Sequence, residues 1–187
     1  MIIWIPVSLV ILFMLWMIII YNGLVALKNE VRNAWKQIDV QLTRRHDLIP
    51  NLVNVVKGYM QYERDTLEKV VSARTRALNA ADLPEKAAAE NILTQTLDRL
   101  FAVIENYPVL KSNVNVLELQ EELTSTENKI SFSRQLYNDL AANYATKLEI
   151  FPNNLVASLF GFRKEEFFSA GEDDVQVPHP GLRRGDE

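Results

Sequence analysis

The chain has 187 residues, contains no cysteine and carries a formal net charge of -4, with a pI near 5.3. The acidic balance argues against a broad nucleic-acid-binding surface, and the lack of cysteine excludes disulfides and thiol chemistry. The residues that follow the first 21 are numerous enough for one domain with a substantial core.

An uncharged apolar run from Ile2 to Tyr21 is the strongest feature of the sequence. As a helix, its roughly twenty residues measure about 30 Å, the thickness of the hydrocarbon core of a bilayer. The run has neither the basic region nor the small-residue cleavage site of a signal peptide. We therefore expect residues 1–21 to form a retained transmembrane anchor. The alternative is a core helix that is apolar on every side.

Positively charged residues follow the apolar run but do not precede it. Lys28, Arg32 and Lys36 come first, and Arg44 and Arg45 follow. Lys and Arg near the end of a span tend to remain in the cytoplasm. The pattern therefore favours an N-terminus outside the cytoplasmic membrane and a cytoplasmic domain after the single span.

Apolar residues at three- and four-residue spacing predict helices throughout residues 22–151. Asp47 is expected to cap the second of these helices, with Pro50 in its first turn. Asp82 and Glu85 form a capping box for the third. The expected fold is all-α, with the transmembrane helix continuing into an antiparallel bundle of four long helices. These helices are predicted at about 22–45, 48–79, 83–105 and 111–151.

The fourth predicted helix carries apolar residues at a regular spacing of seven. Such a heptad repeat requires a long, nearly parallel neighbour. We expect the repeat to form the inner edge of the bundle, and an intermolecular coiled coil is the alternative. The core heptad consists of Val116, Leu123, Ile130, Tyr137, Tyr144 and Phe151.

A short apolar segment at 152–168 follows the predicted bundle. It is too apolar for a free tail, and it could cap the bundle, lie on a membrane or join subunits. Capping is the favoured interpretation. Residues 169–187 are rich in Gly, Pro and acidic side chains, which predicts a disordered acidic tail. The possible self-association surface of the segment comprises Leu155, Leu159, Phe160, Phe162, Phe167 and Phe168.

Two stretches of the sequence resemble the LemA family. The first lies within 21–74 and contains RRHDLIPNLV, and the second, at 107–162, contains TENKISFSRQLYNDL. The resemblance covers nearly all of residues 21–168. It implies a single-span protein of the bacterial inner membrane with a helical bundle and no established enzymatic activity. It also implies membrane roles, because some members are associated with magnetosome membrane formation and others with membrane stress.

Motifs for catalysis or metal binding are missing from the sequence. His46 lies beside a predicted turn and His179 in the predicted tail, and neither follows a carboxylate by three residues, as in di-iron bundles. There is no zinc spacing, phosphate-binding loop or nucleophile elbow. We therefore expect no enzyme, no metal and no cofactor. Carboxylates do cluster at Glu118, Glu121, Glu122 and Glu127, where a solvated face is favoured over a metal or acid–base site.

Arg44, Arg45 and Asp47 form one concentrated polar cluster. The favoured interpretation is structural: Asp47 caps a helix, and the arginines stabilise the C-terminus of the preceding one. The alternative is a site for an anionic partner or a neighbouring subunit. By the helical rise, the cluster lies roughly 35 Å beyond the bilayer, against a Debye length of about 8 Å, so headgroups of the same membrane are out of reach.

These features favour a membrane-anchored, non-enzymatic helical scaffold that self-associates into a large homo-oligomer and organises or remodels the inner membrane. The alternative is an adaptor that presents its bundle to a membrane protease, a transporter or another membrane protein without forming a lattice. A hydrolase or metal enzyme in the bundle core is a third and less favoured class. The expected partners are the lipid bilayer and further copies of the chain, and nucleic acid is not among them.

Overall fold

The computed structural model describes residues 4–60 and 62–169, and within these ranges the chain is helical with no strand. The fold class predicted from sequence is confirmed. The helices are α1 (Trp4–Lys57), α2 (Arg64–Asn79), α3 (Leu83–Ile104), α4 (Pro108–Lys111), α5 (Val114–Glu149) and α6 (Asn153–Phe160).

The first helix, α1, is a continuous rod of 54 residues, or about 81 Å at 1.5 Å per residue. The helices predicted at 22–45 and 48–79 are therefore wrong, because α1 runs through Asp47 and Pro50 without a break and ends at Lys57. The rest of the second predicted helix is α2, which begins at Arg64. Asp47 lies in the middle of a helix and caps nothing.

The N-terminal part of α1 is a candidate membrane span. Among the described residues, α1 is the one helix that is long and apolar enough to cross a membrane, and only 6% of its apolar window is buried. This exposure does not fit the alternative of a core helix, whose apolar faces would be covered by the rest of the protein.

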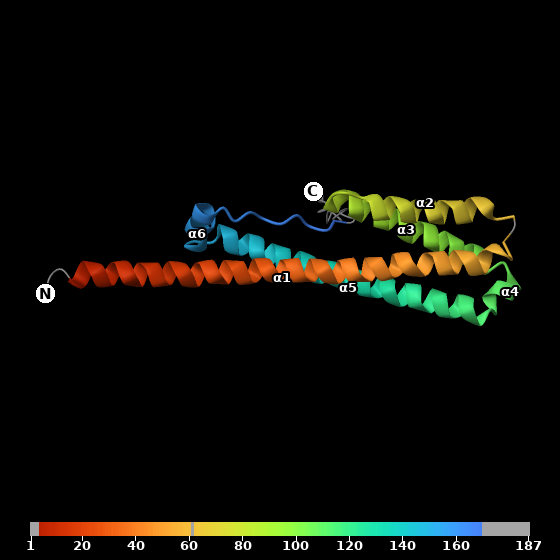
Figure 1. Ribbon diagram of the computed structural model, residues 1–187, viewed down its shortest axis with the longest axis horizontal. Coiled ribbons are helices and arrows are strands. Elements are labelled where there is room, and N and C mark those ends of the chain that lie inside the picture. The colour runs from red at the N-terminus through yellow and green to blue at the C-terminus, as the bar shows by residue number, and fades with distance from the viewer. Residues whose placement is uncertain (1–3, 61, 170–187) are drawn as a thin grey trace, which may run out of the picture.

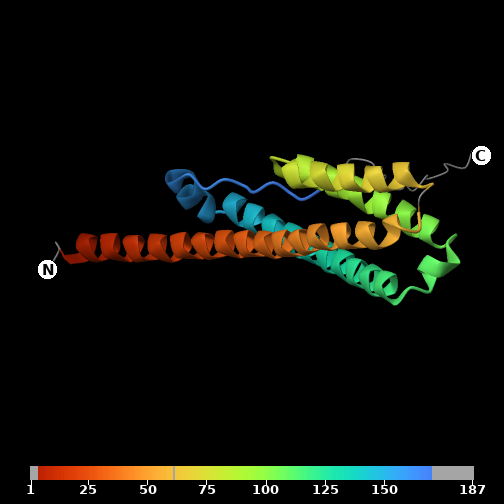
Figure 2. The same ribbon diagram turned by 45° about the vertical axis from the view of Figure 1, so that its right-hand side comes forward.

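Helices α1 and α5 lie side by side and run in opposite directions, while α2 and α3 form a hairpin over the part of α1 farthest from the N-terminus (Figures 1 and 2). The short helix α4 joins α3 to α5 at that end. Helix α6 lies at the other end of α5, beside α1. Four helices, α1, α2, α3 and α5, therefore lie together only in the half of the molecule farthest from the N-terminus, which we call the distal half. Towards the N-terminus, α1 and α5 continue as a pair.

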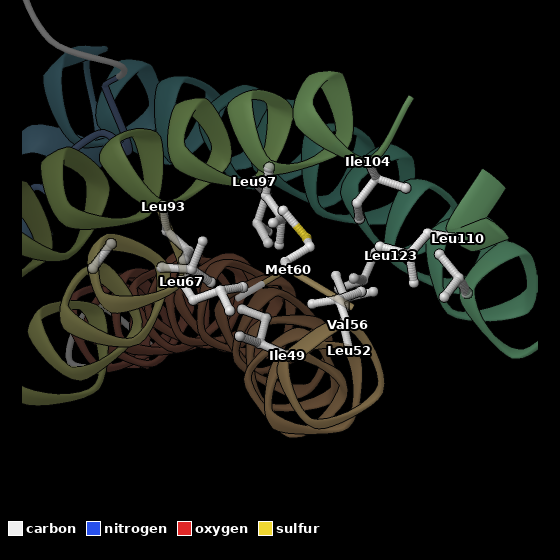
Figure 3. Close-up of a cluster of buried hydrophobic side chains, with 14 of the residues drawn as sticks. Ile49, Leu52, Val56, Met60, Leu67, Leu93, Leu97, Ile104, Leu110 and Leu123 are labelled. Carbon is white, nitrogen blue, oxygen red and sulfur yellow. The ribbon is translucent and has the colours of Figure 1, made fainter. Parts of the chain in front are cut away.

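The buried side chains form two separate hydrophobic clusters. The distal cluster joins α1, α2, α3, α4 and the start of α5 (Figure 3). The second cluster, on the side of the span, joins α1, α3, α5, α6 and the C-terminal segment. On α1 the second cluster ends at Leu42 and the distal cluster begins at Ile49.

Local signals explain where α3 and α5 begin. The Asp82 side chain caps α3 by accepting a hydrogen bond from the Glu85 amide at 2.8 Å, as predicted. The Glu85 side chain reaches back one residue further than in a standard capping box, because it accepts from the amide of Ala81 at 3.1 Å rather than from that of Asp82. Asn113 caps α5 by accepting from the Asn115 amide at 3.0 Å, so this helix begins at Val114 rather than at 111.

The heptad residues on α5 face the core in five of six positions. Val116, Leu123, Ile130, Tyr137 and Tyr144 are buried. Phe151 is 73% exposed; its inclusion was wrong, because α5 ends at Glu149 and the periodicity of a helix does not extend past its end. The partner of the repeat is α1 of the same chain.

The C-terminal segment returns along the bundle after α6. Gly161 turns the chain with a φ of 70°, a conformation that side chains disfavour. Asn138 then pairs with the backbone of Phe168 in both directions, accepting from its amide at 2.8 Å and donating to its carbonyl at 3.0 Å. Phe168 is buried beside Trp35 and under the Arg134 guanidinium, 4.5 Å from its ring centre. The tail predicted at 169–187 lies, from residue 170 on, outside the described residues.

Candidate functional site

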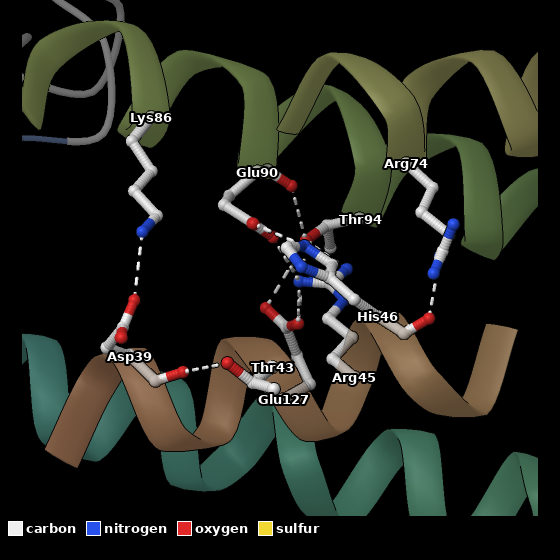
Figure 4. A network of polar contacts seen from close by, with 9 residues as sticks. All are labelled: Asp39, Thr43, Arg45, His46, Arg74, Lys86, Glu90, Thr94 and Glu127. Carbon is white, nitrogen blue, oxygen red and sulfur yellow. Dashed lines mark hydrogen bonds and ion pairs between the residues drawn. The ribbon is translucent and has the colours of Figure 1, made fainter. Parts of the chain in front are cut away.

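A layer of polar side chains crosses the bundle between the two hydrophobic clusters (Figure 4). Arg45 and His46 project from α1 at this level, and both are buried. Glu90 and Thr94 meet them from α3, and Glu127 meets them from α5. We call these five residues the polar layer.

Each member of the polar layer has a defined partner. Arg45 Nη1 lies 2.8 Å from Glu127 Oε2 and 3.6 Å from Glu90 Oε2. Arg45 Nη2 donates a hydrogen bond to Thr94 Oγ1 at 2.7 Å. His46 Nε2 lies 2.7 Å from Glu90 Oε1. The Glu90 carboxylate therefore joins the two side chains that α1 contributes.

The charges of the layer compensate one another. Arg45 and Glu90 are 2% and 0% exposed, and a buried charge without a partner is strongly destabilising. Arg134 of α5 adds a second cation nearby: burial lowers the pKa of its guanidinium, whereas Glu127 and Glu90 act to raise it. The layer thus resembles the buried polar groups that fix the alignment of helices, here of α1 with α3 and α5.

Helix α1 continues through Pro50, and a side chain from another helix supplies the hydrogen bond that proline cannot donate. Proline has no amide hydrogen, so the carbonyl four residues earlier, that of His46, loses its partner within the helix. Arg74 Nε of α2 donates to this carbonyl at 2.7 Å (Figure 4). A side chain 28 residues away therefore satisfies the backbone and connects α2 to the polar layer.

The residues of the predicted polar cluster have three different environments. Arg45 is buried, so its predicted role at a helix C-terminus is wrong, and its anionic partners belong to the same chain. Arg44 is exposed and pairs with Glu122 at 3.5 Å. Asp47 is exposed in mid-helix. His46, placed beside a turn by the sequence interpretation, is instead a buried member of the layer.

The sequence did contain a signal for the polar layer. Arg45 continues the three- and four-residue spacing of Ile38, Leu42, Ile49 and Leu52, so a charged residue occupies a core position. A charge in an apolar stripe requires a buried counter-charge. The identity of that counter-charge, Glu90, depends on tertiary packing and is not encoded in any local pattern.

Among the described residues, no group of three or more His, Asp or Glu side chains is arranged to hold a metal ion. In the polar layer, the Glu90 and Glu127 carboxylates face the Arg45 guanidinium. Glu118, Glu121 and Glu122 are exposed on α5, at the surface of the molecule.

A surface groove lies between α1 and α5 and is lined by residues of these two helices alone. Its apolar residues Val40, Leu117 and Phe132 are exposed, Phe132 to 69%. Lys36, Lys129 and Glu121 supply charges, and the remaining lining is polar: Gln37, Gln41, Gln120, Thr124, Ser125, Asn128 and Ser133. We call this surface the α1–α5 groove.

The six residues of the predicted self-association surface are divided by the fold. Phe168 is buried in the core of its own chain, so it is not available to another copy, and its place on that surface was wrong. Phe162 is half-buried against Tyr21. The exposed members are Leu155, Leu159, Phe160 and Phe167.

Comparison with known proteins identifies the family. The profile of the LemA family matches residues 34–179, most of the chain. The chain belongs to the LemA family. The match begins within α1, after the candidate span, and includes every residue of the polar layer.

Relatives with names include two kinds of protein. The chain is 27% identical over 167 residues to Protein LemA of Metamycoplasma hominis, covering 87% of this chain and 75% of that protein. It is 24% identical over 187 residues to Magnetosome protein MamQ 2 of Paramagnetospirillum magneticum, covering 84% and 69%. Magnetosome protein MamQ of Magnetospirillum gryphiswaldense is 22% identical over the same shares. With the apolar helix, these matches support a membrane-associated helical protein.

Proposed function

We propose that this LemA-family protein is a membrane-anchored, non-enzymatic scaffold that self-associates and organises the bacterial inner membrane. The observation that carries the proposal is the α1–α5 groove, where Val40, Leu117 and Phe132 are exposed close together. Clustered apolar side chains rimmed by polar ones are typical of protein interaction sites. The likeness to magnetosome proteins supports the membrane role.

The chemistry of the groove suits a second copy of the same chain. In a two-fold contact the same patch meets itself, so it must be complementary to itself; this contact alone closes at a dimer, and larger assemblies need a second contact elsewhere on the protein. The groove carries both signs of charge, and Lys36 or Lys129 of one copy can pair with Glu121 of the other. Anchors confined to one membrane also raise the effective concentration of neighbouring copies, so weak side contacts add up to an assembly.

Particle size tests the proposal. The full-length protein in mild detergent and in nanodiscs should form large particles by light scattering and by electron microscopy. Phe132→Asp should shrink them without loss of helicity, because this side chain is exposed. Tyr62→Asp is the matched control, since Tyr62 is an exposed aromatic residue outside the groove. Removal of residues 1–21 should also reduce the size.

A full-length protein that stays monomeric in both environments would contradict the scaffold and favour the adaptor. If particles persist in Phe132→Asp but disappear when residues 1–21 are removed, the contacts lie elsewhere on the protein, and the groove is not the interface.

The proposed orientation places the bundle in the cytoplasm, on the basis of Lys28, Arg32 and Lys36 behind the span. A protease added to intact spheroplasts should leave the bundle uncut and digest it only after lysis. Digestion in intact spheroplasts would reverse the orientation.

A further inference from the structure

Helix α6 is packed against the end of the candidate membrane span. The Tyr21 ring lies 4.8 Å from the ring of Phe160 and 5.6 Å from that of Phe162, measured between centroids. Met17 and Ile20, in the last turns of the span, pack on the hydrophobic cluster that contains Val156 and Ala157 of α6. Helix α6 is thus held at the level where the apolar run of α1 ends (Figure 1).

The surface of α6 has three different faces. Val156 and Ala157 are buried against the bundle. Leu155 and Leu159, one helical turn apart, share a second face and are 59% and 70% exposed. A third face carries exposed Asn154 and Ser158. Side chains four residues apart lie on one side of a helix, so the exposed apolar and polar faces are distinct.

Further exposed apolar side chains lie next to α6 in the chain. Ile150 and Phe151, between α5 and α6, are also exposed, whereas Phe160, four residues after the buried Val156, lies on the side of α6 that meets Tyr21. Full burial of a large apolar side chain is worth about 1.5–3 kcal/mol relative to full exposure, and these side chains are 47–73% exposed, so covering them would recover part of that free energy. The arrangement is favourable where an apolar environment covers the face.

The span indicates what that environment is. Trp16 and Tyr21 lie near its inner end, where aromatic side chains mark the boundary between acyl chains and headgroups. Helix α6 packs on Tyr21 and on the last turns of the span. When the span crosses a bilayer, α6 therefore lies at the depth of the boundary between acyl chains and headgroups.

We propose that α6 is a membrane-surface helix, with Leu155, Leu159 and Phe151 inserted among the lipids and with Asn154 and Ser158 facing water. Amphipathic helices of this kind lie in the plane of the interface, with the apolar face about 5–10 Å into the headgroup and acyl boundary. The proposal requires that the span crosses the membrane, but it does not depend on self-association. It gives each protein a second contact with the bilayer beside its anchor.

Site-directed spin labelling tests the proposal directly, because the chain has no native cysteine. Leu159→Cys, Ser158→Cys and Leu12→Cys variants of the full-length protein would carry a nitroxide in vesicles of phosphatidylcholine and phosphatidylglycerol. Oxygen concentrates in lipid and a nickel chelate in water, so collision rates with the two reagents report depth. Ser158 is the matched control on the polar face of α6, and Leu12 reports insertion of the span. All three side chains are exposed, and circular dichroism verifies that helicity is retained.

The expected result is a loss of nickel collisions at position 159 and at position 12, with free nickel access at position 158. Equal nickel access at 158 and 159, with position 12 protected, would overturn the proposal while leaving the span in place. Nickel access at position 12 would reject the span and the surface helix together. Nanodiscs that hold a single copy separate lipid from a neighbouring protein: if position 159 loses its protection there, a second copy covers it and the proposal fails.

Discussion

Replacement of Glu90 by Gln tests whether the polar layer contains a true buried ion pair. The amide has nearly the same shape as the carboxylate, so packing is preserved while the negative charge is removed. Glu90 Oε2 lies 3.6 Å from Arg45 Nη1, and Oε1 lies 2.7 Å from His46 Nε2. The variant would leave the buried Arg45 with one carboxylate instead of two.

The structure sets the size of the effect. Removing one partner of a buried ion pair costs about 3–5 kcal/mol. Here Arg45 keeps Glu127 at 2.8 Å, and the Glu127 side chain is 34% exposed, so solvent screens the charge that remains. We therefore expect Glu90→Gln to lower the free energy of unfolding by about 3 kcal/mol, the lower end of that range. This is a large part of the 5–15 kcal/mol that is typical of a folded domain.

Urea denaturation followed by circular dichroism at constant detergent concentration measures the loss. Glu122→Gln is the matched control, because this carboxylate pairs with Arg44 at 3.5 Å on the surface, with both side chains about half exposed. Surface pairs contribute less than about 1 kcal/mol. If the two variants lose the same stability, the carboxylate of Glu90 does not stabilise Arg45, and the layer is not a charged one.

Three further predictions follow from the packing. Ile130→Asp should unfold the protein and abolish its helical dichroism, because Ile130 is fully buried and an unpaired core charge costs several kcal/mol; a stable, helical variant would show that this face of α5 is not core. Asn138→Ala should release the C-terminal segment, since two hydrogen bonds to Phe168 are lost; hydrogen exchange at the Phe168 amide should accelerate about tenfold, and unchanged exchange would contradict the tether. Burial raises the pKa of Tyr137 and of Tyr144, so above pH of about 10 the unfolded chain releases protons that the folded chain retains, and stability should fall as pH rises. Absorbance titration near 295 nm should show these two tyrosines, and Tyr107, whose pKa is also raised, ionising later in the folded protein than in urea.

Features of the fold that depend on neighbouring residues could be read from the sequence. The apolar run, the Asp82 cap of α3 and the spacing of Val116, Leu123 and Ile130 each lie within a few turns of helix. Short-range spacing determines which side of a helix is apolar, and capping residues determine where it begins. For this reason α3 begins at the predicted residue, and Ile130 faces the core.

Features that depend on distant residues could not be read in this way. Pro50 normally predicts a helix start or a break, and its place in mid-helix is explained by Arg74 of another helix. The pairing of Arg45 with Glu90 likewise depends on how α1 and α3 are aligned. Phe168 was assigned to the surface because its burial requires the chain to turn at Gly161 and return along the bundle.

Because α1 runs unbroken through Gly23 and Pro50, the candidate membrane span and the far end of the bundle belong to one continuous helix. From Tyr21 to Lys57 this helix measures about 54 Å, so tilting the span by about 20° would displace the distal tip sideways by roughly 18 Å. Spans tilt to match the thickness of their bilayer. If the span crosses a bilayer, a change in bilayer thickness that tilts the span would therefore move α2 and α4, several nanometres away, without any change inside the bundle.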